Sequence, residues 1–170
     1  MSAQQWIDEA NAVAAKQSKI GVSSQEALRS RSGLDFLRAI VSGELPAPPI
    51  GRTLNFRPIS ADEGRVIFQG EPTAEFYNPI GSIHGGWTST LLDSCMACAV
   101  QTTLPAGRGY TTVELKINLV RALREDTGPV RAEGWIVHAG RQIATAEGRL
   151  TGADGKLYAH GSTTCLILAT

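Results

Sequence analysis

Hydrophobic and polar residues follow two spacings along this chain. Residues 3–19 and 23–41 place apolar side chains three or four positions apart, which is typical of helices. From residue 53 the spacing falls to two, which is typical of strands. A long run of small and apolar residues, 85–104, interrupts the strand-like part and predicts a further helix. The predicted order is therefore a helical segment, two strands, a long helix and four strands.

The first fifty residues differ from the rest in the spacing of their apolar side chains, which is helical over residues 3–19 and 23–41. Two serines at the start of the second helical segment can cap it, and Gly43 with the run LPAPPI at 45–50 ends it, because proline cannot continue a helix. We expect residues 1–50 to form a helical N-terminal arm that packs on a main domain of residues 51–170. A partly mobile extension is the alternative.

The strand-like segments are separated by short turn sequences. Strands joined by such turns pair antiparallel, and a single buried helix then needs the sheet to wrap around it. The fold class that we predict is α+β, with a curved antiparallel sheet around one central helix. The strand candidates are residues 54–57, 66–69, 110–121, 130–138, 142–151 and 157–167.

Asp93 is the only formally charged residue between His84 and Arg108. A lone carboxylate on a helix that is expected to be buried almost all round is costly unless it is paired or used chemically. The start of the helix offers unpaired N–H groups and a partial positive charge, and Gly85 and Gly86 have no side chains to block access to them. Such donors can stabilise a carbonyl oxygen under attack, while the carboxylate attacks or activates water.

The spacing of these two features predicts a dimer. Asp93 follows Gly85 by eight residues, which places it about 12 Å along the axis at a rise of 1.5 Å per residue. One helix cannot bring its own start to its own carboxylate, so a second copy must supply one of them. If no site exists, the glycine pair only permits close packing and Asp93 is a core carboxylate with satisfied hydrogen bonds.

Composition narrows the function further. Sixteen basic and sixteen acidic residues cancel, which gives no support for a general nucleic-acid surface. The sequence has no apolar run of signal-peptide or membrane-spanning length, and its three cysteines fit a reducing compartment, so we expect a soluble, cytoplasmic protein with neither nucleic-acid nor membrane partners. The CxxC at 95–98 lies in mid-helix without a second pair, so we expect apolar packing there and no metal site.

Three stretches carry a family resemblance: GSIHGGWTSTLLDSCMACAV, GYTTVELKINLVRAL and TGPVRAEGWIVHAGRQIATAEGRLTGADGKLYAHGSTTCLI. Over residues 54–167 the chain resembles the PaaI-type (phenylacetate-pathway) hotdog-fold acyl-CoA thioesterases. HGG followed seven residues later by Asp is a fairly specific signal in this strand–helix–strand context. The resemblance implies a homodimer whose sheets join, often paired into a homotetramer, with a site at the dimer interface. It implies no cofactor beyond the coenzyme A of the substrate.

The resemblance also implies roles for individual residues. Gly85 matches the residue whose N–H polarises the thioester carbonyl, and His84 and Asn78 match residues that help to hold the thioester or the water. Asp93 matches the acid that the other subunit supplies, as base or as nucleophile. Thr112 is the best match to an assisting hydroxyl on the next strand.

Substrate contacts are predicted more loosely. Gly86 adjoins the carbonyl donor, Trp87 either borders the acyl pocket or is a core aromatic, and Thr111 is the alternative to Thr112. Arg121 and Arg141 are candidates for the CoA phosphates, because guanidinium groups pair well with phosphate oxygens.

The predicted function is hydrolysis of an aromatic or medium-chain acyl-CoA to the free acid and CoA. Direct attack by the carboxylate and activation of water remain open. A non-catalytic acyl-CoA-binding module on the same fold is the alternative, although it would have no use for a buried lone carboxylate. An enoyl-CoA hydratase-type protein is a less favoured alternative. Such enzymes set an Asp and a His close together at the helix start, and this chain has no His a few residues after a site Asp.

Overall fold

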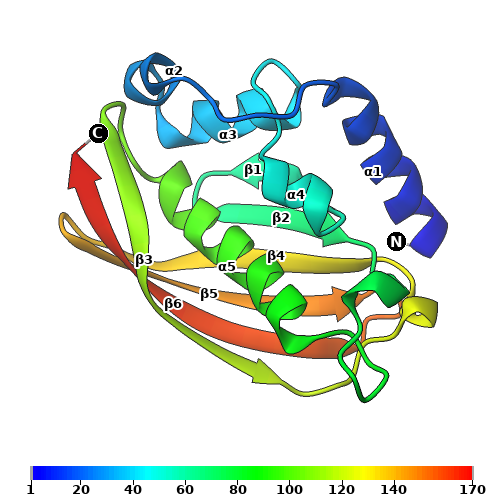
Figure 1. Ribbon diagram of the computed structural model, residues 1–170. Coiled ribbons are helices and arrows are strands. Elements are labelled where there is room, and N and C mark those ends of the chain that lie inside the picture. Colours follow the sequence, from blue (N-terminus) through cyan, green and yellow to red (C-terminus); the bar gives the residue numbers. More distant parts are fainter. Residues whose placement is uncertain (1, 170) are drawn as a thin grey trace.

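The computed structural model describes residues 2–169 (Figure 1). Helices come first and the sheet follows, with one long helix between the second and third strands. The elements are α1 (Ala3–Lys16), α2 (Gln25–Ser30), α3 (Gly33–Val41), α4 (Pro49–Thr53), β1 (Phe56–Asp62), β2 (Arg65–Gly70), η1 (Ala74–Phe76), α5 (Gly85–Thr102), β3 (Arg108–Leu119), η2 (Glu125–Thr127), β4 (Val130–Ala139), β5 (Ile143–Gly152) and β6 (Leu157–Ala169).

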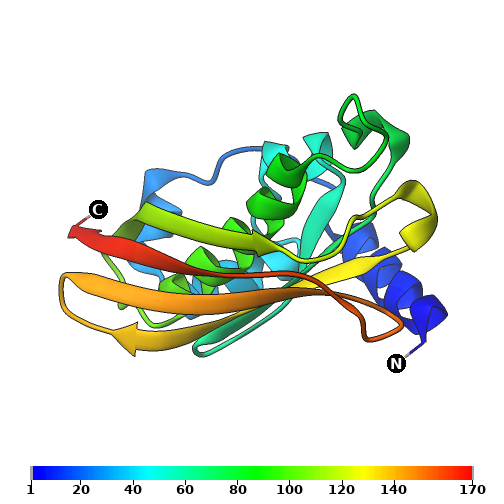
Figure 2. The same cartoon turned by 90° about the horizontal axis from the view of Figure 1, so that it is seen from below.

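All six strands form one antiparallel sheet in the order β1-β2-β4-β5-β6-β3. The sheet curves around α5, and the arm lies along the β1 side of the sheet, where α3 contacts both β1 and α5 (Figures 1 and 2). This confirms the predicted α+β class with a single central helix. β3 forms one edge of the sheet, where it pairs with β6 alone.

α5 lies very close to the middle of the sheet. Gly134 of β4 and Gly148 of β5 are directly paired beneath it. A Cβ atom on Gly134 would lie 2.4 Å from the carbonyl carbon of Cys95, and one on Gly148 would lie 2.7 Å from the Cγ atom of Met96. Cys95 and Met96 are fully buried at this contact. Glycine at these two strand positions therefore sets how closely the helix packs.

The sequence predicted a helix that is buried almost all round. This prediction is wrong for one face of α5. The face toward the sheet is buried, but the opposite face carries a stripe of small polar residues that one chain leaves partly open. Burying this stripe requires a second surface. The stripe consists of Gly86, Ser89, Thr90, Asp93 and Ser94.

The N-terminal arm is attached to the sheet through Arg131 of β4, whose side chain is buried. Its guanidinium donates to Glu9 Oε2 at 2.6 Å and to Gln69 Oε1 at 2.9 Å, and it lies 4.5 Å from the ring centroid of Trp6. The arm thus packs on the main domain. Its last helix, α4, crosses residue 50, where we had placed the boundary.

No helix within residues 2–169 is long and apolar enough to cross a bilayer.

Candidate active site

The loop before α5 is organised by the side chain of Asn78. Its Oδ1 accepts from the N–H groups of Ile80 and Ser82 at 3.1 and 3.2 Å, and its Nδ2 donates to Ser82 Oγ at 3.0 Å. Gly81 completes the turn with a φ of +83°, a conformation that favours glycine. All the polar atoms of the Asn78 amide thus bind its own loop, so within one chain this residue shapes the approach to the helix start.

His84 caps α5 through its imidazole. Nδ1 accepts the Gly86 N–H at 2.9 Å, so a neutral ring carries its proton on Nε2. The exposed His84 therefore presents an Nε2–H donor at the helix start. The Gly86 donor is occupied by this cap. Within residues 2–169, the Gly85 N–H has no hydrogen-bond acceptor and is free to bind an oxygen.

Asp93 and Thr112 form a pair within one chain. Thr112 Oγ1 donates to Asp93 Oδ1 at 3.1 Å. Both side chains are partly buried, whereas the neighbouring Thr111 is exposed and belongs to the opposite face of β3. An irregularity follows directly, between Thr112 and Glu114, where the pairing with β6 shifts by one residue. The hydroxyl that contacts the carboxylate is thus that of Thr112.

Two neutral groups, which the sequence did not single out, lie near this carboxylate. Burial is the main cause that raises the pKa of the Cys98 thiol to about 12, and the negative charge of Asp93 adds to it. Burial likewise raises the pKa of the Tyr110 hydroxyl, again with a contribution from Asp93. Both groups stay protonated at neutral pH. Tyr110 could have been found from its position two residues before Thr112, on the same strand face.

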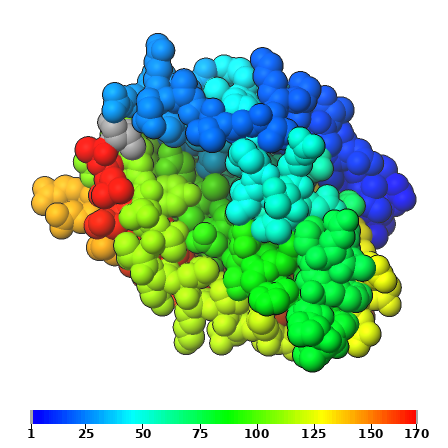
Figure 3. Space-filling model, in the orientation of Figure 1, coloured from blue at the N-terminus to red at the C-terminus, as the bar shows by residue number. Residues whose placement is uncertain are grey.

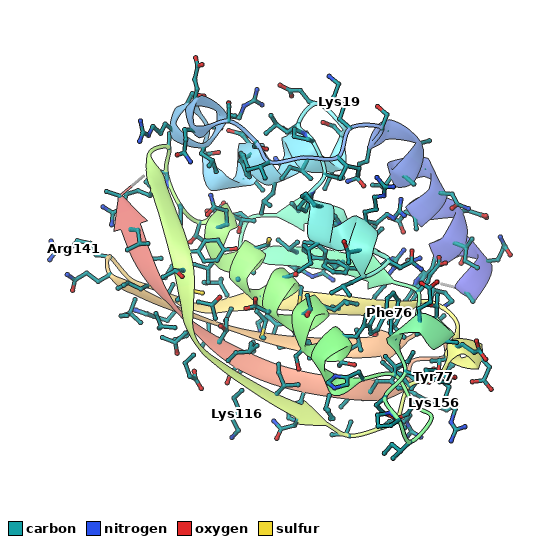
Figure 4. The ribbon with its side chains drawn as sticks, in the orientation of Figure 1. Lys19, Phe76, Tyr77, Lys116, Arg141 and Lys156 are labelled. Carbon is teal, nitrogen blue, oxygen red and sulfur yellow. The ribbon has the colours of Figure 1, made fainter. Side chains whose placement is uncertain are left out.

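Trp87 is a core residue with one edge at a cavity. It is 3% exposed, its Nε1 donates to the Leu54 carbonyl at 2.7 Å, and its ring stacks on Phe76 with centroids 5.8 Å apart. The same ring borders a cavity of about 430 Å³ that His84 also lines. Figure 4 shows Phe76 and Tyr77, which line this cavity too, close to the start of α5.

The two arginines predicted for phosphate binding are not brought together in one chain. Arg121 follows the end of β3 and is exposed, with its backbone N–H bound to the Tyr158 carbonyl at 3.1 Å. Arg141 lies in the turn between β4 and β5, at the far end of the molecule from Tyr77 (Figure 4). Its backbone carbonyl accepts from Arg108 Nη2 at 3.2 Å.

Each chain therefore carries two candidate half-sites. The first consists of the Gly85 N–H and the His84 Nε2–H. The second consists of Asp93 with Thr112. They are separated by eight residues on one helix, or about 12 Å along its axis. No group of three or more His, Cys, Asp or Glu side chains in the described part of the chain could hold a metal ion.

Known proteins are similar to this chain over the region that contains these groups. The family model described as the thioesterase superfamily matches residues 80–159, which include both half-sites. Human acyl-coenzyme A thioesterase 13 is 31% identical over 105 residues, which make up 61% of this chain and 73% of the human protein. The chain belongs to the thioesterase superfamily. It is a thioester hydrolase by class.

Solved structures of this superfamily share the fold. A phenylacetic acid degradation-related protein from Ralstonia eutropha JMP134 is 29% identical with a TM-score of 0.70, over 76% of this chain and 98% of that chain. The PaaI protein of E. coli is 22% identical with a TM-score of 0.65, over 71% of this chain and 85% of that chain. The hotdog fold and the PaaI-type resemblance are thereby confirmed.

Proposed function

We propose that this thioesterase hydrolyses acyl-CoA at a site shared by two subunits. The observation that carries the proposal is the partly open pair of Asp93 on α5 and Thr112 on β3. The similarity to human acyl-coenzyme A thioesterase 13 supports CoA as the thiol that leaves.

The edge strand β3 supports a dimer. Its outer edge offers unpaired backbone groups, and such an edge is a ready template for pairing with another chain. Val113 and Leu119 are each 56% exposed and Leu115 is 38% exposed, which is unusual for apolar residues of a strand. Antiparallel pairing of β3 with a second β3 covers this edge. About the same two-fold axis, the α5 start of one subunit faces Asp93 of the other.

The two half-sites then have complementary tasks. The thioester oxygen accepts the Gly85 N–H of one subunit, with the His84 Nε2–H as a second donor. Asp93 of the partner takes a proton from a water molecule as that water attacks the carbonyl carbon. The carbon–sulfur bond breaks, CoA leaves as the thiol with the proton, and the acid is released. Direct attack by Asp93 would instead give a mixed anhydride that water hydrolyses.

The paired β3 strands also bring distant arginines together. Antiparallel pairing places the end of one β3, next to Arg121, beside the start of the partner's β3, where Arg108 contacts the Arg141 turn. Guanidinium groups from both subunits thus flank one CoA, whose phosphates they bind. A homotetramer of two such dimers leaves these sites unchanged.

Asp93→Asn tests the function directly. Thiol release is measured with a thiol reagent across acyl-CoA substrates that include acetyl, octanoyl and phenylacetyl groups. We expect kcat to fall by roughly 10²–10⁴-fold, the usual contribution of a general base. The dimer measured by sedimentation should persist. Asp126→Asn, an exposed carboxylate on η2, is the matched control.

Each alternative has its own result when binding and hydration are measured beside thiol release. Near-normal turnover in Asp93→Asn contradicts the mechanism. Binding of acyl-CoA by the unaltered protein without thiol release identifies a binding module, and loss of enoyl-CoA absorbance without thiol release identifies a hydratase.

A further inference from the structure

An apolar pocket of about 380 Å³ lies between the arm and the hotdog domain. This volume lies within the range of ligand pockets, roughly 300–1,000 Å³. Leu28 and Phe36 of the arm form one wall, and Phe68, Cys98 and Tyr110 of the domain form the other. In Figure 3 the surface is hollowed below α3, between α4 and β3. None of the residues of the two candidate half-sites lines this pocket, so they do not explain why it is there.

The pocket adjoins the carboxylate. Tyr110 in its wall lies two residues before Thr112, on the same face of β3, and Thr112 is bonded to Asp93. Cys98 in its wall lies between one and two turns beyond Asp93 on α5. The charge of Asp93 is felt by both the Cys98 thiol and the Tyr110 hydroxyl. A thioester carbonyl held at Asp93 is therefore near the wall of the pocket that Cys98 and Tyr110 form.

The chemistry of the walls selects the occupant. None of the residues that line the pocket is formally charged, and its polar side chains are limited to Gln101, Cys98 and Tyr110. An ionised group placed there would lack a partner and would be costly to bury. An aliphatic or aryl group, in contrast, gains from leaving water.

Leu28 and Phe36 lie outside the fully buried core, whereas two other arm residues that line the pocket, Leu37 and Ile40, belong to it. α2 has no buried residue, and Leu28 is only partly buried. Phe36 is likewise partly buried on α3. The apolar side chains of Leu28 and Phe36 line the pocket and stay partly exposed to solvent in the single chain.

We infer that the N-terminal arm walls the acyl-binding pocket and sets the size of an apolar acyl group that the enzyme accepts. The inference rests on the proposed function and extends it to a substrate class. The acyl group binds beside Asp93 of the same subunit, while the Gly85 donor comes from the other. Leu28 and Phe36 are the residues that determine specificity.

Leu28→Trp tests the inference because it narrows the pocket from a loosely packed helix. The measurement is kcat/KM for octanoyl-CoA and phenylacetyl-CoA, each divided by kcat/KM for acetyl-CoA. We expect both ratios to fall at least tenfold. Val22→Trp is the matched control, since Val22 is an apolar arm residue that is 87% exposed and does not line the pocket. It should keep both ratios.

A second pair of measurements keeps the inference testable if Leu28→Trp does not fold. Leu28→Ala enlarges the pocket and should raise the dodecanoyl-to-octanoyl ratio several-fold. In the unaltered enzyme, succinyl-CoA should react at least 100-fold more slowly than octanoyl-CoA. If Leu28→Trp lowers the octanoyl-to-acetyl ratio alone, the acyl group that the pocket takes is aliphatic. If it lowers the phenylacetyl-to-acetyl ratio alone, that acyl group is aryl.

The two proposals fail in different ways. If the unaltered protein hydrolyses no acyl-CoA, the proposed function is wrong. If it hydrolyses them but Leu28→Trp has the same acyl profile as Val22→Trp, or if succinyl-CoA reacts as fast as octanoyl-CoA, the function stands and the arm does not set the acyl group.

Discussion

The hydrogen bond from Thr112 to Asp93 orients a carboxylate that one chain leaves partly open. A carboxylate oxygen held by a hydroxyl points in one direction, which matters for a group that must face a water molecule or a carbonyl carbon. The partner hydroxyl is neutral, so it orients the acid without removing its charge. At the scale of single residues, this bond is the part of the site that one chain completes.

Thr112→Val removes that hydroxyl and keeps the shape of the side chain. A hydrogen bond to a charged group contributes about 1.5–3 kcal/mol, so kcat should fall by roughly 10- to 100-fold. KM should change little, because Thr112 orients the acid and does not hold the substrate. Steady-state kinetics with octanoyl-CoA measure both. Thr111→Val, on the other face of β3, should keep kcat, and an equal loss in both variants would argue against the role.

The sequence predicted these residues unevenly, for physical reasons. The carboxylate and the free N–H were predicted from residue type and position. A lone charged residue in an apolar helix and a glycine at the start of that helix can both be recognised in the sequence. The cap by His84 on Gly86 was not found, because it depends on a ring rotamer. The use of Asn78 by its own loop depends on the turn that Gly81 closes, and this also appears only in three dimensions.

At the scale of elements, β3 is the least covered strand, and its helix-facing side carries Leu115. Leu115→Lys places an ammonium group where we expect the partner subunit. Burying it unpaired costs several kcal/mol, so the dimer dissociation constant should rise by about 100-fold or more. Sedimentation over a dilution series measures this, and thiol release should fall in parallel with dissociation.

Asn118→Lys adds the same charge to the opposite face of β3, which takes part in a separate hollow of the sheet. It should leave the dimer contact intact. Dissociation by Asn118→Lys but not by Leu115→Lys would place the interface on the wrong face of the strand.

The strands were predicted well because their apolar residues alternate. Their observed ends lie within two residues of the predicted ones, except that β1 continues to Asp62 where the sequence predicted an end at residue 57. β3 runs from Arg108 to Leu119, where the sequence predicted 110–121. The position of β3 beside β6 was not predictable, since pairing between strands distant in sequence depends on how the sheet closes. For the same reason the open stripe on α5 was missed: composition does not show which face of a helix meets the sheet.

At the scale of the whole molecule, the shared site predicts complementation between two inactive variants. Gly85→Pro removes the carbonyl donor, yet proline is well tolerated at the first position of a helix. His84 before it has φ −59° and ψ 134°, which suits a residue that precedes proline. Asp93→Asn removes the acid. Each variant alone should lose most of its activity, by roughly 10²–10³-fold for the donor.

Mixed dimers should regain activity. In a two-fold dimer of one chain of each kind, one site carries both changes and the other carries neither, so random assembly restores about one quarter of the normal sites. Co-expression with two affinity tags isolates the mixed dimer for assay. If the mixed dimer is as inactive as its parents, the two groups act within a single chain and the shared site is wrong.

The glycine pair beneath α5 has a consequence for the geometry of catalysis. The backbone of α5 lies against Gly134 and the Met96 side chain lies against Gly148, so the space between the helix and the sheet leaves no room for a Cβ atom at either position. We expect the helix to hold the two sites of the proposed dimer at one fixed separation. A methyl group added at Gly134 would push α5 away from the sheet and change the geometry of both sites at once. Catalysis would slow for every substrate alike, with no change in which one is preferred.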